Sequence, residues 1–255
     1  MRDRSLTVLL VLVIIGVAPA MATAQPRDGW TVSVVPLYFW ATELNGQISA
    51  GPATVPVFLE FADAADNLGG AFSFHFEATR GRWGLLTDLN FIQLASSADF
   101  AVGPLRDVEG DFDLDNVMFE LGGIYLLNRA KGVGIIGGLR TYTLSPRIQF
   151  TGSLGSQIAP VDDGDTSPNG FVGLVLRPRI SDKWTFIGRA DIGGGDADLT
   201  WSAVAGVEYR FKAWGGLEAG YKALGIDVKG GNQDLRGYDM THYGPIFGLR
   251  LHWEQ

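Results

Sequence analysis

The sequence predicts an all-β fold, an antiparallel up-and-down transmembrane β-barrel of about ten strands, and three observations lead to this prediction. From Trp30 onward, polar and apolar residues alternate with a period of two, which is typical of strands with one apolar and one polar face. Short connections alternate with longer, acidic ones, as expected for a meander with tight turns at one rim and long loops at the other. Helical periodicity is nearly absent.

Residues 1–24 have the pattern of a signal peptide. Arg2 and Arg4 form a basic end, residues 6–17 form an apolar core, and Ala22 and Ala24 belong to a small-residue cleavage site. The apolar core is shorter than the roughly 20 residues of a membrane helix. We therefore expect export of the chain, with residues 25–255 forming one barrel domain.

The remaining chain divides into strands about as long as a tilted membrane-crossing strand. In residues 72–79, for example, Phe72, Phe74 and Phe76 share one face, and Ser73 and Glu77 share the other. Strands are expected at 30–42, 70–80, 83–96, 114–127, 133–148, 169–180, 184–193, 199–211, 215–227 and 241–253.

The strand count can range from about eight to twelve, because some connections allow more than one interpretation. Residues 43–61 can form a protruding hairpin, and residues 62–68 form the only plausible helical turn. Long connections are expected near 43–69, 97–113, 150–168, 194–198 and 228–240, and short ones at 80–83, 128–132, 181–184 and 212–215.

The charged residues on the polar faces indicate which way these faces point. By parity we expect the lumen to be lined by His75, Glu77, Asp88, Glu120, Arg140, Arg177, Arg179, Arg189, Asp191, Glu208, Arg210, Glu218, Lys222 and Arg250. The set contains six acids and seven permanent bases although the whole chain has a net charge of −8. Such balance favours an enclosed interior, because a buried charge without a partner is costly.

The apolar face is then expected to contact lipid. Trp83, Trp184, Trp214 and Trp253 fall at the tight-turn ends of strands, where tryptophan is typical of an interfacial girdle. Alternation alone also allows the opposite arrangement, a soluble barrel with its apolar face inward.

Composition excludes several classes of function. The chain has 20 Lys and Arg against 28 Asp and Glu, so it has no basic field for nucleic acid. It has no cysteine, and therefore no thiol nucleophile or cysteine-ligated metal. We expect no cofactor.

Several segments resemble a family of small exported outer-membrane β-barrel proteins, most of which have no assigned activity. The resemblance is carried by VVPLYFWA at 34–41 followed by Asn45 and Gly46, RGRWGLLTD at 80–88, GYKAL at 220–224, and HYGPIFGLR at 242–250. It implies the outer membrane as location, with the lipid bilayer and, during insertion, the barrel-assembly machinery as partners. Barrels of this class commonly end on an aromatic residue, whereas here two residues follow Trp253.

Candidate catalytic and metal sites are few. With only His75, His242 and His252 in the chain, an enzyme would pair His242 with Asp239 or with the acids at 162–163, as in outer-membrane aspartyl-type proteases. The spacing of Asp239 and His242 does not match the short Asp-x-His pair of those enzymes, and there is no Gly-x-Ser-x-Gly elbow. We therefore expect no catalytic residues.

The acidic run at 107–115 lacks the spacing of a calcium loop and is interpreted as a solvated loop edge, with weak divalent bridging to anionic lipid headgroups as the alternative. No metal site is expected.

A barrel of eight to ten strands has an interior about wide enough for side chains to fill. The predicted function is therefore a non-enzymatic outer-membrane barrel, structural or surface-binding, with a lumen largely occluded by charge pairs. One alternative is a narrow pore for small solutes, and another is a soluble periplasmic barrel that binds an apolar ligand.

Overall fold

The computed structural model describes residues 29–50, 53–59, 68–102, 105–150, 161–162, 165–230 and 235–254. The predicted signal peptide and residues 62–67 of the predicted helical turn lie outside these ranges. Within them the secondary structure consists of strands and turns. The described part of the chain contains no helix that is long and apolar enough to cross a membrane.

Fourteen strands follow one another along the chain. They are β1 (Trp30–Val35), β2 (Tyr38–Trp40), β3 (Glu43–Ala50), β4 (Ala53–Leu59), β5 (Leu68–Arg80), β6 (Trp83–Val102), β7 (Leu105–Asn128), β8 (Val133–Phe150), β9 (Val161–Asp162), β10 (Asp165–Leu176), β11 (Trp184–Gly195), β12 (Leu199–Lys212), β13 (Gly215–Lys229) and β14 (Leu235–Glu254).

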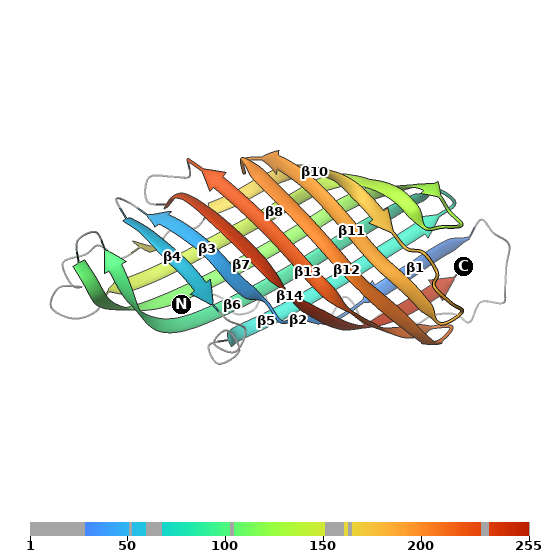
Figure 1. Ribbon diagram of the computed structural model, residues 1–255, viewed down its shortest axis with the longest axis horizontal. Coiled ribbons are helices and arrows are strands. Elements are labelled where there is room, and N and C mark those ends of the chain that lie inside the picture. The colour runs from blue at the N-terminus through green and yellow to red at the C-terminus, as the bar shows by residue number, and fades with distance from the viewer. Residues whose placement is uncertain are drawn as a thin grey trace, which may run out of the picture.

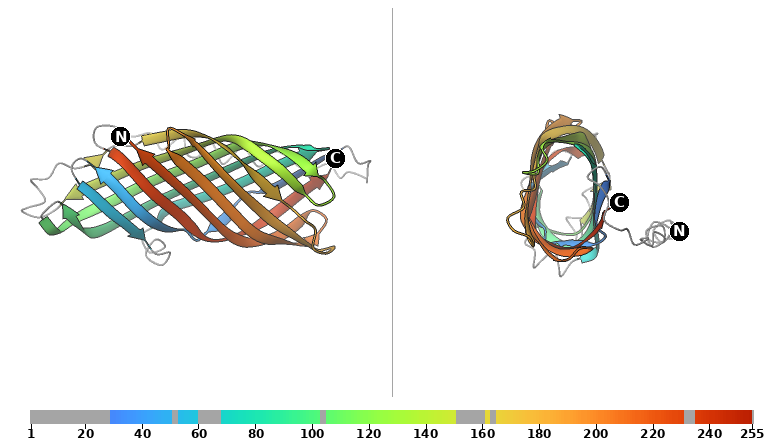
Figure 2. Two further views of the ribbon diagram at one scale, coloured as in Figure 1. Left: turned by 45° about the horizontal axis from the view of Figure 1, so that its top comes forward. Right: turned by 90° about the vertical axis from the view of Figure 1, so that its right-hand side faces the viewer.

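Ten of these strands close into an antiparallel barrel in the order β1-β5-β6-β7-β8-β10-β11-β12-β13-β14. Closure occurs at β1, where Thr31 pairs with Thr79 of β5 on one side and with Glu254 of β14 on the other. The tilted strands form the wall in Figure 1, and the end-on view in Figure 2 shows a closed, elliptical ring. The predicted ten-stranded barrel is thus confirmed.

The N-terminal strand closes the barrel only near the tight turns. The ladder between β1 and β5 ends at the pair Val35 and His75, and the next residue, Pro36, has no N–H to continue it. Beyond this point β2 and β3 pair with β14 but form no ladder with β5, and β3 pairs on its other side with β4. The β3–β4 hairpin is the protruding hairpin expected at 43–61, and it adds to the ten strands of the barrel.

Strands extend into several predicted connections, as where β10 begins at Asp165 and β14 at Leu235, and the largest error is at 97–113. Residues 97–113 were expected to be a long loop, but β6 continues to Val102 and β7 starts at Leu105, and the two pair with each other. The acids of this segment alternate with Val108, Gly110 and Phe112, so its period of two continues the strand pattern. Acidity alone is therefore not evidence for a loop.

The outer wall of the barrel is apolar. Leu139 is 64% exposed and Val172 61%, while Arg140, the neighbour of Leu139 in the sequence, is 1% exposed. Among the described residues, nine of the ten barrel strands carry exposed large apolar side chains; examples are Leu85, Phe119, Ile192, Leu217 and Phe247. The polar face of the sheet therefore encloses the lumen.

Candidate functional site: the barrel interior

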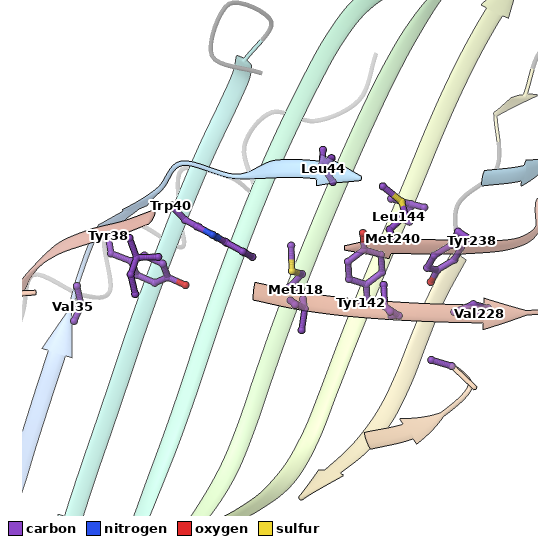
Figure 3. Packing of buried hydrophobic residues seen from close by; sticks show 14 residues of the cluster. Val35, Tyr38, Trp40, Leu44, Met118, Tyr142, Leu144, Val228, Tyr238 and Met240 are labelled. Carbon is purple, nitrogen blue, oxygen red and sulfur yellow. The ribbon is translucent and has the colours of Figure 1, made fainter. Parts of the chain in front are cut away.

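The interior of the barrel has a charged zone and an apolar zone. Ion pairs occupy the lumen from the tight-turn rim to its middle. Apolar side chains occupy the lumen from its middle toward the long-loop rim. Figure 3 shows the apolar side chains, which come from strands on different sides of the barrel and point toward one another.

The first of three charged groups joins four strands around Arg140 of β8. Its guanidinium donates to Glu120 Oε1 at 2.6 Å, to Asp191 Oδ1 at 2.7 Å and to Thr200 Oγ1 at 3.0 Å. Arg189 donates to the other oxygen of each carboxylate, Glu120 Oε2 at 2.6 Å and Asp191 Oδ2 at 2.7 Å. Two carboxylates and two guanidiniums thus neutralise each other, and each carboxylate is held from two sides.

The second group crosses the lumen between β6 and β13. Asp88 Oδ1 accepts hydrogen bonds from Lys222 Nζ and from Tyr38 Oη, both at 2.9 Å, and from Asn90 Nδ2 at 2.5 Å. The other oxygen, Oδ2, lies 3.1 Å from His75 Nδ1. Because β6 and β13 lie on different sides of the ring, this group ties two sides of the wall together.

The third group lies closer to the tight-turn rim. Arg177, just after β10, donates to Glu77 of β5 at 2.5 Å and makes a second link across the lumen. Arg250 Nε donates to Glu218 Oε2 at 2.8 Å, and His252 Nε2 lies 2.6 Å from Glu208 Oε1.

The apolar zone contains a buried hydrogen-bonded chain. Asn116 Nδ2 donates to Tyr142 Oη at 2.5 Å, and Tyr142 Oη lies 2.6 Å from His242 Nε2. Met118, Leu144 and other apolar residues surround the three side chains. In this zone Asn116 Oδ1, His242 Nδ1 and Trp40 Nε1 are examples of buried polar atoms that have no hydrogen-bond partner among the described residues.

Thirteen of the predicted lumen residues lie inside the barrel or at its inner edge, and all of these have a charged or polar partner. Arg179 is the exception and corrects the prediction, because it is exposed at the rim. Strand β10 ends at Leu176, and Pro178 belongs to an irregular segment, so the two-residue parity no longer applies there. Without Arg179 the predicted set has six acids and six permanent bases.

The pairing of Asp239 with His242 does not occur. Asp239 is exposed, while His242, three positions later and therefore on the opposite face of β14, is 1% exposed. Asp162 is described only as part of β9, and Asp163 lies outside the described residues. The described residues contain no group of three or more acids or histidines that could hold a metal ion.

The uncharged members of these groups were not predicted from the sequence. Tyr38, Asn90, Asn116, Tyr142 and Thr200 are all buried and hydrogen-bonded in the interior. Their position in the alternating pattern could have predicted an inward orientation, because Asn90 and Tyr142 each lie two positions from a predicted lumen residue. Their partners were not readable from the sequence, because they lie on distant strands.

The four predicted girdle tryptophans are at the tight-turn ends of strands, with Trp83 68% exposed. Three of them contact neighbouring aromatic rings in tilted or edge-to-face geometry, and these partners were not predicted. The ring centroids are 4.8 Å apart for Trp83 and Tyr125, 4.9 Å for Trp184 and Tyr209, and 5.6 Å for Trp214 and Phe211.

Comparison with known proteins shows similarity at the level of the fold. No family model matches the sequence. No curated protein sequence matches it either. The outer membrane protease OmpT from Escherichia coli is 9% identical with a TM-score of 0.51, covering 91% of this chain and 99% of its own.

Two further solved structures have TM-scores below 0.5. The translocator domain of the autotransporter NalP from Neisseria meningitidis is 13% identical with a TM-score of 0.44, covering 88% of this chain and 89% of its own. The attachment invasion locus protein Ail of Yersinia pestis is 10% identical with a TM-score of 0.38, covering 89% and 100%. At these identities the similarity to OmpT shows a shared barrel fold and nothing about activity.

Proposed function

We propose that this protein is a non-enzymatic outer-membrane β-barrel that acts as a structural or surface-binding protein, with a lumen closed by its own side chains. The observation that carries the proposal is the set of ion pairs across the lumen. Lys222 reaches Asp88, Arg177 reaches Glu77, and Arg189 reaches Glu120, and each pair joins parts of the barrel wall that are not neighbours in the strand order.

The wall supports a membrane location. A soluble barrel would bury its large apolar side chains, whereas here leucine, isoleucine, valine and phenylalanine side chains cover the outside. The aromatic side chains at the tight-turn rim fit the girdle that marks the membrane interface in barrels of this kind. The same arrangement argues against a soluble periplasmic barrel with an apolar ligand inside. A location in the outer membrane also accords with the predicted signal peptide.

Surface binding would involve the long-loop rim. Asp196, Asp198 and Asp239 are exposed there, and the β3–β4 hairpin and the long β6–β7 hairpin extend from the same end. Such an acidic surface favours cationic or cation-bridged partners.

Fractionation of the membranes and recording from planar bilayers test the two parts of this proposal separately. We expect the protein in the outer-membrane fraction, extracted only by detergent. The reconstituted full chain should show no large, steady open channels. Steady openings of the wild-type chain would refute the occluded lumen, and extraction without detergent would refute the location.

A narrow pore for small solutes is the second candidate, and an interior cavity favours it. This cavity of about 50 Å³ lies between the charged groups and is lined by Asp88, Lys222, Arg177, Arg250 and other residues. A pore would make solute flux depend on the bases inside the lumen. Flux in proteoliposomes that falls on Arg177→Gln but not on Arg179→Gln would favour the pore, since only Arg177 is inside.

A further inference from the structure

The tight-turn rim carries a group of exposed bases, which we name the basic collar. It consists of Arg80, Arg82, Arg129, Lys131, Arg179, Lys183 and Lys212. Among the described residues, the exposed acids at this rim are Asp182 and Glu254. The collar is therefore strongly positive in a chain whose net charge is −8.

The opposite rim has the opposite sign. Asp113, Asp196, Asp198 and Asp239 are exposed there. Lys229, an exposed base at this end, is neutralised by Asp227 at 2.8 Å. The exposed charge is thus separated along the barrel axis, with a basic tight-turn rim and an acidic long-loop rim. The two rims would therefore attract partners of opposite charge.

Aromatic side chains lie next to the collar. Arg82 precedes Trp83, Lys183 precedes Trp184, and the Lys183 ammonium lies 6.0 Å from the centroid of the Tyr209 ring. Bases just outside a ring of exposed aromatic residues match the two chemical parts of a lipid at the membrane interface, because the rings lie at headgroup level and the bases reach the phosphates.

The turn between β5 and β6 has the most complete form of this arrangement. Arg80, Gly81, Arg82, Trp83 and Tyr125 line a shallow groove open to solvent. Gly81 has a φ of 61°, and no atom lies within 4 Å of the position where a Cβ would stand. The positive φ of Gly81 permits the tight turn that places the two bases beside the edge-to-face pair of Trp83 and Tyr125.

We propose that the basic collar is a docking surface for anionic phospholipid headgroups, with the groove at the β5–β6 turn as one binding position. The inference rests on the proposed membrane location and adds a lipid preference to it. A base near an anionic surface increases binding about fivefold. The collar has several such bases, so the preference for anionic over zwitterionic lipid should be severalfold or more at low salt.

Quenching of tryptophan fluorescence by brominated lipids can measure this preference. The full chain is reconstituted in nanodiscs of phosphatidylcholine, and equal fractions of brominated phosphatidylglycerol or brominated phosphatidylcholine are then introduced. The tryptophans at the tight-turn rim report on lipids next to the collar. We expect phosphatidylglycerol to quench more strongly, with the difference shrinking as salt screens the charges.

The triple variant Arg82→Gln, Lys183→Gln and Lys212→Gln removes three bases next to girdle tryptophans. It should lower the relative association constant for phosphatidylglycerol at least about fivefold. The control variant Lys229→Gln makes the same kind of substitution at the opposite rim and should leave the constant unchanged.

The outcomes separate this inference from the proposed function. Equal quenching of the wild-type chain by both lipids, or equal effects of the triple variant and Lys229→Gln, overturns the lipid preference and leaves the membrane barrel intact. Absence of quenching by either lipid overturns both. The salt series needs no variant, so the inference stays testable if the triple variant does not fold.

Discussion

Replacing Arg140 with methionine is the sharpest test of the charged lumen. Arg140 is 1% exposed and holds Glu120, Asp191 and Thr200, so its loss leaves two carboxylates against the single guanidinium of Arg189. Breaking a buried pair from one side typically costs about 3–5 kcal/mol, because a charge remains uncompensated. We expect a loss of this size in the free energy of unfolding, measured by urea titration of the micelle-bound barrel with tryptophan fluorescence.

Two further variants isolate the cause. Arg147→Met removes an arginine whose side chain is 39% exposed and lies 3.1 Å from Asp115, and a pair this accessible contributes about 0–1 kcal/mol. Adding Glu120→Gln to Arg140→Met restores charge balance and should recover part of the stability. Arg140→Met and Arg147→Met should lower the free energy of unfolding by different amounts, and equal losses would refute the explanation based on buried charge. A double variant less stable than Arg140→Met alone would refute it as well.

Two more substitutions test other parts of the barrel. Tyr142→Phe removes the hydroxyl that lies 2.6 Å from His242 Nε2 and leaves buried polar atoms unpaired, which should cost about 1–3 kcal/mol in the same urea titration; an unchanged midpoint would contradict the hydrogen-bonded chain. Gly225→Val should cost about 1–3 kcal/mol and shift the tryptophan emission, because a Cβ would lie 2.1 Å from Trp201 Nε1. Gly70→Ala is its control, since the nearest atom to a Cβ there is 3.8 Å away, and equal effects of the two glycine substitutions would count against the packing argument.

The strands could be predicted from the sequence because their pattern depends only on neighbouring residues. In a strand each side chain points opposite to its neighbour, so the burial of Glu208 and the exposure of Leu217 follow from parity once the strand is identified. The same logic failed where the backbone departs from a regular strand. Arg179 follows Pro178 in an irregular segment, and its orientation could not be obtained by counting from β10.

Connections were harder to predict than strands. The segment at 97–113 was mistaken for a loop because of its acids, although its alternation was visible. Pairing between β6 and β7 decides that the segment is extended, since each strand satisfies the backbone hydrogen bonds of the other.

By itself the sequence determined the all-β class and the face of each strand that carries charge, because side-chain alternation is a property of neighbouring residues. It limited the strand count to about eight to twelve, and barrel closure fixed that count at ten. Only the tertiary structure decided which charges meet. Lys222 and Asp88, and Arg177 and Glu77, come together because barrel closure brings distant strands to within reach across one lumen. Partner choice of this kind depends on strand order and register around the whole ring, which no local pattern contains.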